Sequence, residues 1–316
     1  MITSLFKNNI LSYFLVSALA VLLWGIAFFQ ISLDVPVSIN FANQEFLFSR
    51  KIALFFSFSV TLFGAFFLNY KLKKYLFSYQ PTNLFAFFYI LISGLGISSP
   101  FIIVFSLVAL GLVFVSNYLF YFIENKESES QVFNAAFILG FLIFHNIAFV
   151  VLIPLLLLNL GAVRRITDKE IILIMTGFLL PSILLTLLSI LTENLEILNA
   201  MLHIDFSFPK IPWKSAALHL IILLISAAGY RLVVTKRSGI DINIFRLTKN
   251  MFVFLIAIFV LVIVSLFLFS ISYVGFVISI PVSIFLAAYF TNSTVKYKEI
   301  LFLILVVAII LNSFAK

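Results

Sequence analysis

The stretch VFNAAFILGFLIFHNIAFVVLIPLLLLNL, residues 132–160, decides the topology of this chain. It contains no Asp, Glu, Lys or Arg. As one α-helix it would be about 43 Å long at 1.5 Å per residue. The hydrocarbon core of a membrane is about 30 Å thick, so the stretch is too long for one upright crossing and short for two. Whether it crosses once or twice determines the orientation of every helix that follows.

The composition of the whole chain is strongly apolar. Of 316 residues, 64% are hydrophobic and 10% are charged, and the mean hydropathy is +1.24. Soluble domains are roughly 45–50% apolar and about 25% charged. The composition therefore predicts an all-α polytopic integral membrane protein, with residues 1–316 forming a single transmembrane domain. Because the chain has no cysteine, disulfides, thiolate catalysis and cysteine-ligated metals are excluded.

Apolar runs of about 20 residues predict about eleven membrane-spanning helices, within a range of about ten to twelve. The apolar sequence continues beyond Ala18-Leu19-Ala20, so the first helix is not a cleaved signal peptide. Ser98-Ser99-Pro100 divides a longer run, because serine is a favoured N-cap and proline is favoured at the first helical position. The predicted spans are residues 11–30, 52–69, 84–97, 101–123, two within 132–160, 171–191, 216–233, two within 251–290, and 300–311.

Basic residues decide between the two topologies. The net charge of +8 is carried by short loops between apolar runs, which argues against nucleic-acid binding and indicates orientation by the positive-inside rule. If residues 132–160 form a helical hairpin turning near His145-Asn146, fifteen of the twenty Lys and Arg residues are cytoplasmic and five are outside. A single helix would leave eight inside and twelve outside. We therefore predict the hairpin, a cytoplasmic N-terminus, and outer-face loops at residues 31–50 and 192–215.

This orientation places all three histidines and several acidic residues at the outer face. General acid–base chemistry needs groups that titrate near neutral pH, and histidine or a desolvated carboxylate supplies them. Cationic side chains at a surface are suited to hold phosphate. The candidate catalytic residues are Asp34, His145, His203, Asp205 and His219, and the candidate phosphate-binding residues are Arg50, Lys51, Lys210 and Lys214.

Each candidate also has a purely structural interpretation. Asp34 precedes Val35-Pro36 and can be a turn residue, and His145 can cap or pack at a tight turn. His219 can anchor its helix at the membrane interface, and the two cations at residues 50–51 can bind lipid headgroups. The Arg50-Lys51 pair therefore indicates an anionic ligand without distinguishing a substrate phosphate from an ordinary lipid.

The outer segment 192–215 carries polar residues at helical spacing. Glu193, Glu196, Asn199 and His203 are three, three and four residues apart, which places them on one face of a short helix. Such a helix either lies on the bilayer as an amphipathic anchor or covers a polar site. Metal-binding motifs such as HExxH are absent, as are P-loops and dinucleotide fingerprints. We predict no cofactor and no metal ligands, although the pattern leaves a divalent metal open.

Two stretches resemble the GT-C superfamily of membrane glycosyltransferases. Asp34 lies in the first outer loop, in the place of the acidic residue of those enzymes. The stretch GFLIFHNIAFVVLIPLLLLNLGAVRRITDKEIILIMTGFLLPSILL, residues 140–185, resembles their middle region, with a short hairpin, a basic turn and a G-x-x-x-P helix. It is also similar to an uncharacterised family of multi-pass inner-membrane proteins from Bacteroidota. The resemblance covers about residues 1–190, with a shorter first outer loop and a single acid instead of a pair.

The resemblance implies a transferase in the bacterial inner membrane that acts at the outer face on a polyprenyl-phosphate-linked sugar or envelope precursor. Asp34 would then deprotonate an acceptor hydroxyl. The alternative is a non-enzymatic membrane subunit or transport partner of envelope biogenesis, with the outer segment as its docking surface. A transporter ranks third, because no charged residue falls in the middle of a predicted span. Membrane lipids are the expected partners, and the sequence does not define an oligomeric state.

Overall fold

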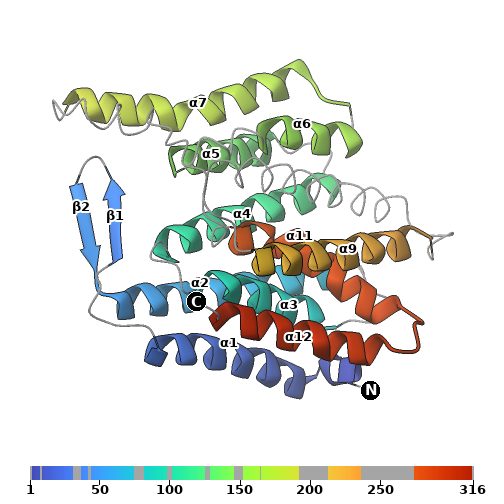
Figure 1. Ribbon diagram of the computed structural model, residues 1–316. Coiled ribbons are helices and arrows are strands. Elements are labelled where there is room, and N and C mark those ends of the chain that lie inside the picture. Colours follow the sequence, from blue (N-terminus) through green and yellow to red (C-terminus); the bar gives the residue numbers. More distant parts are fainter. Residues whose placement is uncertain are drawn as a thin grey trace.

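A computed structural model describes residues 2–7, 9–30, 37–41, 44–74, 82–97, 102–124, 129–145, 152–163, 165–191, 213–235 and 274–314. Helices dominate this part of the chain and lie side by side with their long axes in similar directions (Figure 1). The helical elements are η1 (Ile2–Phe6), α1 (Ile10–Gln30), α2 (Arg50–Lys74), α3 (Leu84–Ser93), η2 (Gly94–Gly96), α4 (Ile102–Glu124), α5 (Glu129–His145), α6 (Leu152–Val163), α7 (Asp168–Leu191), α9 (Trp213–Thr235), α11 (Val274–Asn292) and α12 (Lys298–Phe314).

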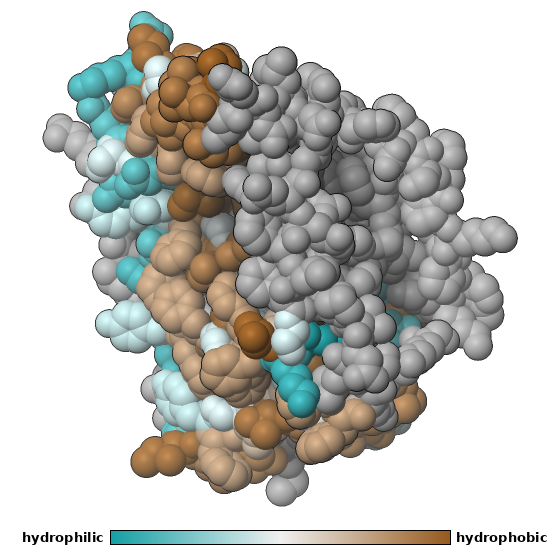
Figure 2. Space-filling view, turned by 90° about the vertical axis from the view of Figure 1, so that its left-hand side faces the viewer, coloured by the Kyte–Doolittle hydropathy of each residue, from teal (hydrophilic) through white to brown (hydrophobic). Residues whose placement is uncertain are grey.

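Four described helices are long and apolar enough to cross a membrane: Ile10–Phe29, Arg50–Lys73, Asp168–Leu191 and Ala217–Thr235. Shorter apolar helices accompany them. In Figure 2, which looks along the bundle, apolar side chains form a band from top to bottom of the described surface. The prediction of a helical membrane protein is therefore confirmed at this level.

The hairpin predicted within residues 132–160 is confirmed. Helix α5 ends at His145 and α6 begins at Leu152, so the stretch contains two helices. Helices α5 and α7 run parallel: Lys169 Nζ lies 2.7 Å from Glu129 Oε2 where both begin, and further along, Gly140 lies against Pro181. The chain must therefore return between them, as the charge argument requires. Glu129, expected in a loop, belongs instead to the first turn of α5.

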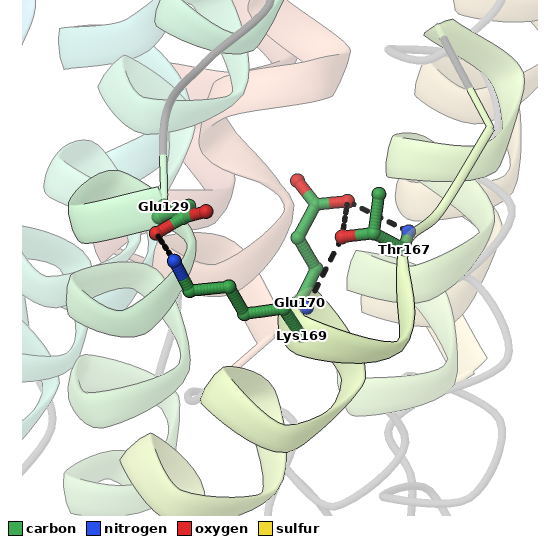
Figure 3. A network of polar contacts seen from close by, with 4 residues as sticks. All are labelled: Glu129, Thr167, Lys169 and Glu170. Carbon is green, nitrogen blue, oxygen red and sulfur yellow. Dashed lines mark hydrogen bonds and ion pairs between the residues drawn. The ribbon is translucent and has the colours of Figure 1, made fainter.

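The start of α7 is held by a capping box (Figure 3). The Thr167 backbone N–H donates to Glu170 Oε2 at 3.0 Å, and the Glu170 N–H donates to Thr167 Oγ1 at 3.3 Å. This reciprocal pair satisfies backbone donors that a helix start otherwise leaves unpaired. The T-D-K-E sequence of residues 167–170 thus begins the helix earlier than the apolar run from Ile171 suggested.

Helix α3 is the centre of the bundle. All ten of its residues are buried, and it packs against α2 and α11. Aromatic rings fill the space where α3, α11, α12 and η1 meet: Phe88 stacks on Phe290 at 5.5 Å, and Phe87 stacks on Phe302 at 5.6 Å. A helix that is apolar all round is expected at such an interior position.

One end of the bundle gathers most described cations, and we call it the basic end. It contains the starts of α1, α3 and α12 and the end of α2, because Lys73 contacts Tyr13, the Asn83 N–H donates to the Phe6 carbonyl, and Thr3 contacts Glu299. The described lysines at these helix ends are Lys7, Lys71, Lys73 and Lys298. The start of α2, with Arg50 and Lys51, lies at the opposite end.

The N-terminal turn is tied to the last helix at the basic end. Glu299 accepts hydrogen bonds from Thr3 N at 3.0 Å and Thr3 Oγ1 at 2.7 Å. Burial of the carboxyl acts to raise the pKa of Glu299, but hydrogen bonds that include those from Thr3 outweigh it, so the pKa lies below its ordinary value. This contact is consequently strongest with the carboxylate ionised, at neutral pH.

The first outer loop departs from an all-α fold. Strands β1 (Val37–Phe41) and β2 (Gln44–Phe48) form an antiparallel hairpin in which Val37 pairs with Phe48 and Phe41 with Gln44. The hairpin extends from the end of the bundle opposite the basic end (Figure 1). Alternation in VSINF and QEFLF is the signal for it, but the sequence was interpreted only as a loop.

Two predicted helix boundaries also change. Helix α2 extends from Arg50 to Lys74, so Lys71, Lys73 and Lys74 belong to its last turns instead of a separate basic turn. Lysine stems can lie along apolar surface while the ammonium groups reach water, which lets a helix continue through such a sequence. Helix α9 begins at Trp213, earlier than the predicted residue 216.

Candidate functional site: an apolar groove between α1 and α2

A surface groove of about 320 Å³ lies between α1 and α2. Its walls are almost entirely apolar. The α1 residues follow a spacing of three, one and three, and the α2 residues repeat it, so each helix presents one stripe. The lining residues are Val21, Trp24, Gly25 and Phe28 of α1, and Lys51, Leu54, Phe55 and Phe58 of α2.

Gly25 is the reason for the hollow. A Cβ atom placed on it would meet nothing within 4 Å. In a close-packed helix pair a small residue lets the backbones approach, but here the missing side chain leaves open space. The groove can therefore accept a guest chain about as wide as a hydrocarbon tail.

Two cations mark the end of the groove. Lys51 is exposed and places its Nζ 5.8 Å from the centre of the Phe28 ring. Arg50 is the first residue of α2 and is only 7% exposed. The start of a helix carries a partial positive charge that adds to these side chains. An anion at this point would meet three sources of positive potential at the edge of an apolar surface.

Trp24 adds a polar group to the apolar wall. Its side chain is 4% exposed, and within the described residues its indole N–H has no hydrogen-bond acceptor. Its ring meets Phe58 at 6.3 Å in an edge arrangement. Buried donors are normally satisfied, so an unsatisfied one beside a groove suits an acceptor brought by a ligand.

The predicted site residues are distributed unevenly. Asp34, His203, Asp205 and Lys210 lie outside the described residues. His145 ends α5 and Lys214 is the second residue of α9, but the described part of the chain does not include their side chains. Arg50 and Lys51 are brought together at the start of α2, as predicted.

His219 is the predicted residue that the structure places away from the groove. It belongs to α9, which packs on α11, and the groove is lined by α1 and α2 alone. Its side chain is buried, with 9% exposed, so it is not a surface anchor. Starting α9 at Trp213 moves His219 deeper into the helix than the expected first turn.

Sequence reasoning missed the groove because hydropathy does not show which faces of two apolar helices meet. Gly25 was the available signal, since a glycine within a spanning helix often marks a packing face or a gap. It also missed a buried polar chain at the basic end. Asn69 and Asn83 stand at the edges of apolar runs, and both were assigned to loops or helix ends.

The described residues contain no group of three or more His, Asp or Glu that can hold a metal ion. The donor set of the groove, with two cations and one indole N–H, is suited to an anionic oxygen and an apolar chain. No known protein family, curated protein or solved structure matches the chain.

Proposed function

We propose that this chain is a GT-C-like membrane transferase of about eleven spans that acts on a polyprenyl-phosphate-linked sugar or similar envelope precursor. The reaction would occur at the outer face of the bacterial inner membrane, with the N-terminus cytoplasmic. The groove supports this proposal, because an apolar furrow with two cations at its end has the polarity of a lipid that carries a phosphate.

The proposed chemistry divides between two neighbouring segments. Asp34 takes the proton of an acceptor hydroxyl, whose oxygen attacks the anomeric carbon of the sugar. The bond from that carbon to the phosphate oxygen breaks, and the lipid phosphate leaves with the electron pair. Arg50 and Lys51 hold this phosphate and stabilise its developing charge. Lys210 and Lys214 assist them, and His145 or His203 orients the acceptor.

Filling the groove should remove lipid binding. In Gly25→Leu the new side chain occupies the space that Gly25 leaves open. We expect retention of an undecaprenyl phosphate probe by the purified full-length protein to fall at least about tenfold, because the probe loses the contacts of the apolar wall. The measurement is native mass spectrometry or binding of a labelled probe in nanodiscs.

Gly25→Ala is the matched control, since its methyl group meets no atom within 4 Å and should leave binding within about twofold. Asp34→Asn separates binding from chemistry: it should retain the probe and lose sugar transfer. Undiminished binding by Gly25→Leu would contradict the groove as the lipid site. Normal binding by Asp34→Asn together with undiminished transfer would remove Asp34 as the base. A chain that binds the lipid without transfer activity in any form would correspond to the non-enzymatic subunit.

A further inference from the structure

A second pocket lies at the basic end, where α2, α3 and α11 meet. It is partly open, encloses about 30 Å³, and lies at the far end of α2 from the groove. Asn69, Lys73 and Thr82 supply its polar groups. Phe85 and residues of α11, among them Ile284 and Ala287, supply its apolar walls. Such walls exclude water and strengthen the electrostatic attraction of the lysine for an anion.

A directed chain of hydrogen bonds orients Asn83 beside this pocket. Ser12 Oγ donates to the Asn9 carbonyl at 2.8 Å, so it accepts from Asn83 Nδ2. The amide oxygen of Asn83 must then face Asn69, whose Nδ2 donates to it at 2.7 Å. Ser12, Asn69 and Asn83 are all buried. The donors and acceptors of the chain are therefore fixed by the groups at its start.

This use of Asn83 leaves α3 without a side-chain cap. Asn83 occupies the N-cap position, yet its side chain makes no capping hydrogen bond. The Asn83 N–H donates to the Phe6 carbonyl at 2.8 Å, and the Leu84 N–H donates to Thr82 Oγ1 at 3.2 Å. The N–H groups of Phe85 and Ala86 follow in the same turn, and Phe85 lines the pocket. The start of α3 thus adds positive potential there.

Lys73 is held at the pocket by an aromatic contact. Its Nζ donates to Tyr13 Oη at 2.8 Å and lies 4.8 Å from the centre of the same ring. The phenol oxygen is neutral, so it orients the ammonium group without neutralising its charge. Lys73 therefore remains a cation at a pocket whose other polar wall, Asn69, has a second amide N–H to offer.

We propose that the pocket at the basic end binds an anionic phosphate oxygen, with Lys73 as the charged ligand and Asn69 and the first turn of α3 as neutral donors. The volume admits an oxygen of a phosphate whose remainder lies at the surface. Two sources share this chemistry: the headgroup of an anionic phospholipid and free inorganic phosphate. The site is separate from the groove and does not depend on transferase activity.

Lys73→Met tests the site because methionine keeps the apolar stem and removes the charge. In nanodiscs that contain phosphatidylglycerol and phosphatidylcholine, native mass spectrometry should show at least a fivefold loss of retained phosphatidylglycerol. Lys71→Met is the matched control: Lys71 is two residues away on the same helix, lies over Phe67 at 5.8 Å and does not line the pocket. It should change retention less than twofold.

The source of the phosphate is decided by a second measurement on the wild-type protein in detergent. Inorganic phosphate, compared with chloride at equal ionic strength, should raise the melting temperature of the wild type and not of Lys73→Met if free phosphate binds. If only phosphatidylglycerol raises it, the ligand is a lipid headgroup. Equal loss of retention in both lysine variants, or no response of the wild type to either phosphate source, would overturn the proposal. If Lys73→Met does not fold, Lys73→Gln replaces it in the same comparison.

Discussion

Gly229→Ala should destabilise the protein by about 3 kcal/mol or more, although it adds only a methyl group. Gly229 of α9 faces the backbone of α11, and a Cβ there would overlap the carbonyl oxygen of Phe285 and lie 2.9 Å from the carbonyl carbon. A flexible side chain could turn away from a new methyl group, but a helical carbonyl cannot. The two helices would therefore have to separate along their contact.

The separation would also disturb packing that is not at the mutated site. Tyr230 meets Phe285 edge-to-face at 5.7 Å, and Phe285 is fully buried in the common core. In a membrane, helix association depends on close contact because lipid tails are as apolar as leucine side chains. A gap between α9 and α11 consequently has no hydrophobic compensation.

The loss of stability should appear as a lower melting temperature of the purified full-length protein in detergent. Gly161→Ala is the control, because its Cβ would meet Ile166 at 3.5 Å, an ordinary contact, on an exposed face of α6. The control should melt within about 0.5 kcal/mol of the wild type. Equal melting of Gly229→Ala and wild type would contradict the close approach of the two helices.

Helix positions were predictable here because hydropathy and charge are local signals. The division of residues 132–160 followed from counting lysines and arginines, and the structure places α5 and α6 as that count required. The pairing of helices was not predictable in the same way. Gly140 and Gly177 let α5 and α7 meet backbone to backbone, but neither glycine indicates which of the other apolar helices is its partner.

The candidate site shows the same limit. Arg50 and Lys51 were recognisable as possible anion ligands, since two adjacent cations at the edge of an apolar run are rare in this chain. The groove beside them depends on the relative rotation of α1 and α2, which hydropathy does not encode when both helices are apolar on every side. His219 was misplaced for a related reason: its depth depends on where α9 begins, and Trp213 is apolar enough to belong to either helix or loop.

Asn83→Leu should destabilise the protein by about 2–4 kcal/mol, because it removes one member of a buried polar chain and leaves two others unsatisfied. Asn83 is 0% exposed and joins Ser12 of α1 to Asn69 of α2. After the substitution, one amide N–H of Asn69 loses its acceptor where water cannot replace it. The expected measurement is the melting temperature or the denaturant midpoint of the full-length protein in detergent.

The double variant Asn69→Leu/Asn83→Leu decides why stability is lost. If the cost comes mainly from the orphaned amide of Asn69, replacing both asparagines should recover a substantial part of it, since two apolar groups can replace a hydrogen-bonded pair at little cost. If the cost comes from lost packing around α3, the double variant should be worse than either single one. Coupling of the two positions with a recovery of at least about 1 kcal/mol would identify the chain from Asn9 through Ser12 and Asn83 to Asn69 as a polar connection of α1, α2 and α3. Strict additivity would show that each asparagine contributes separately, and the orientation of Asn83 would then no longer explain why α3 lacks a cap.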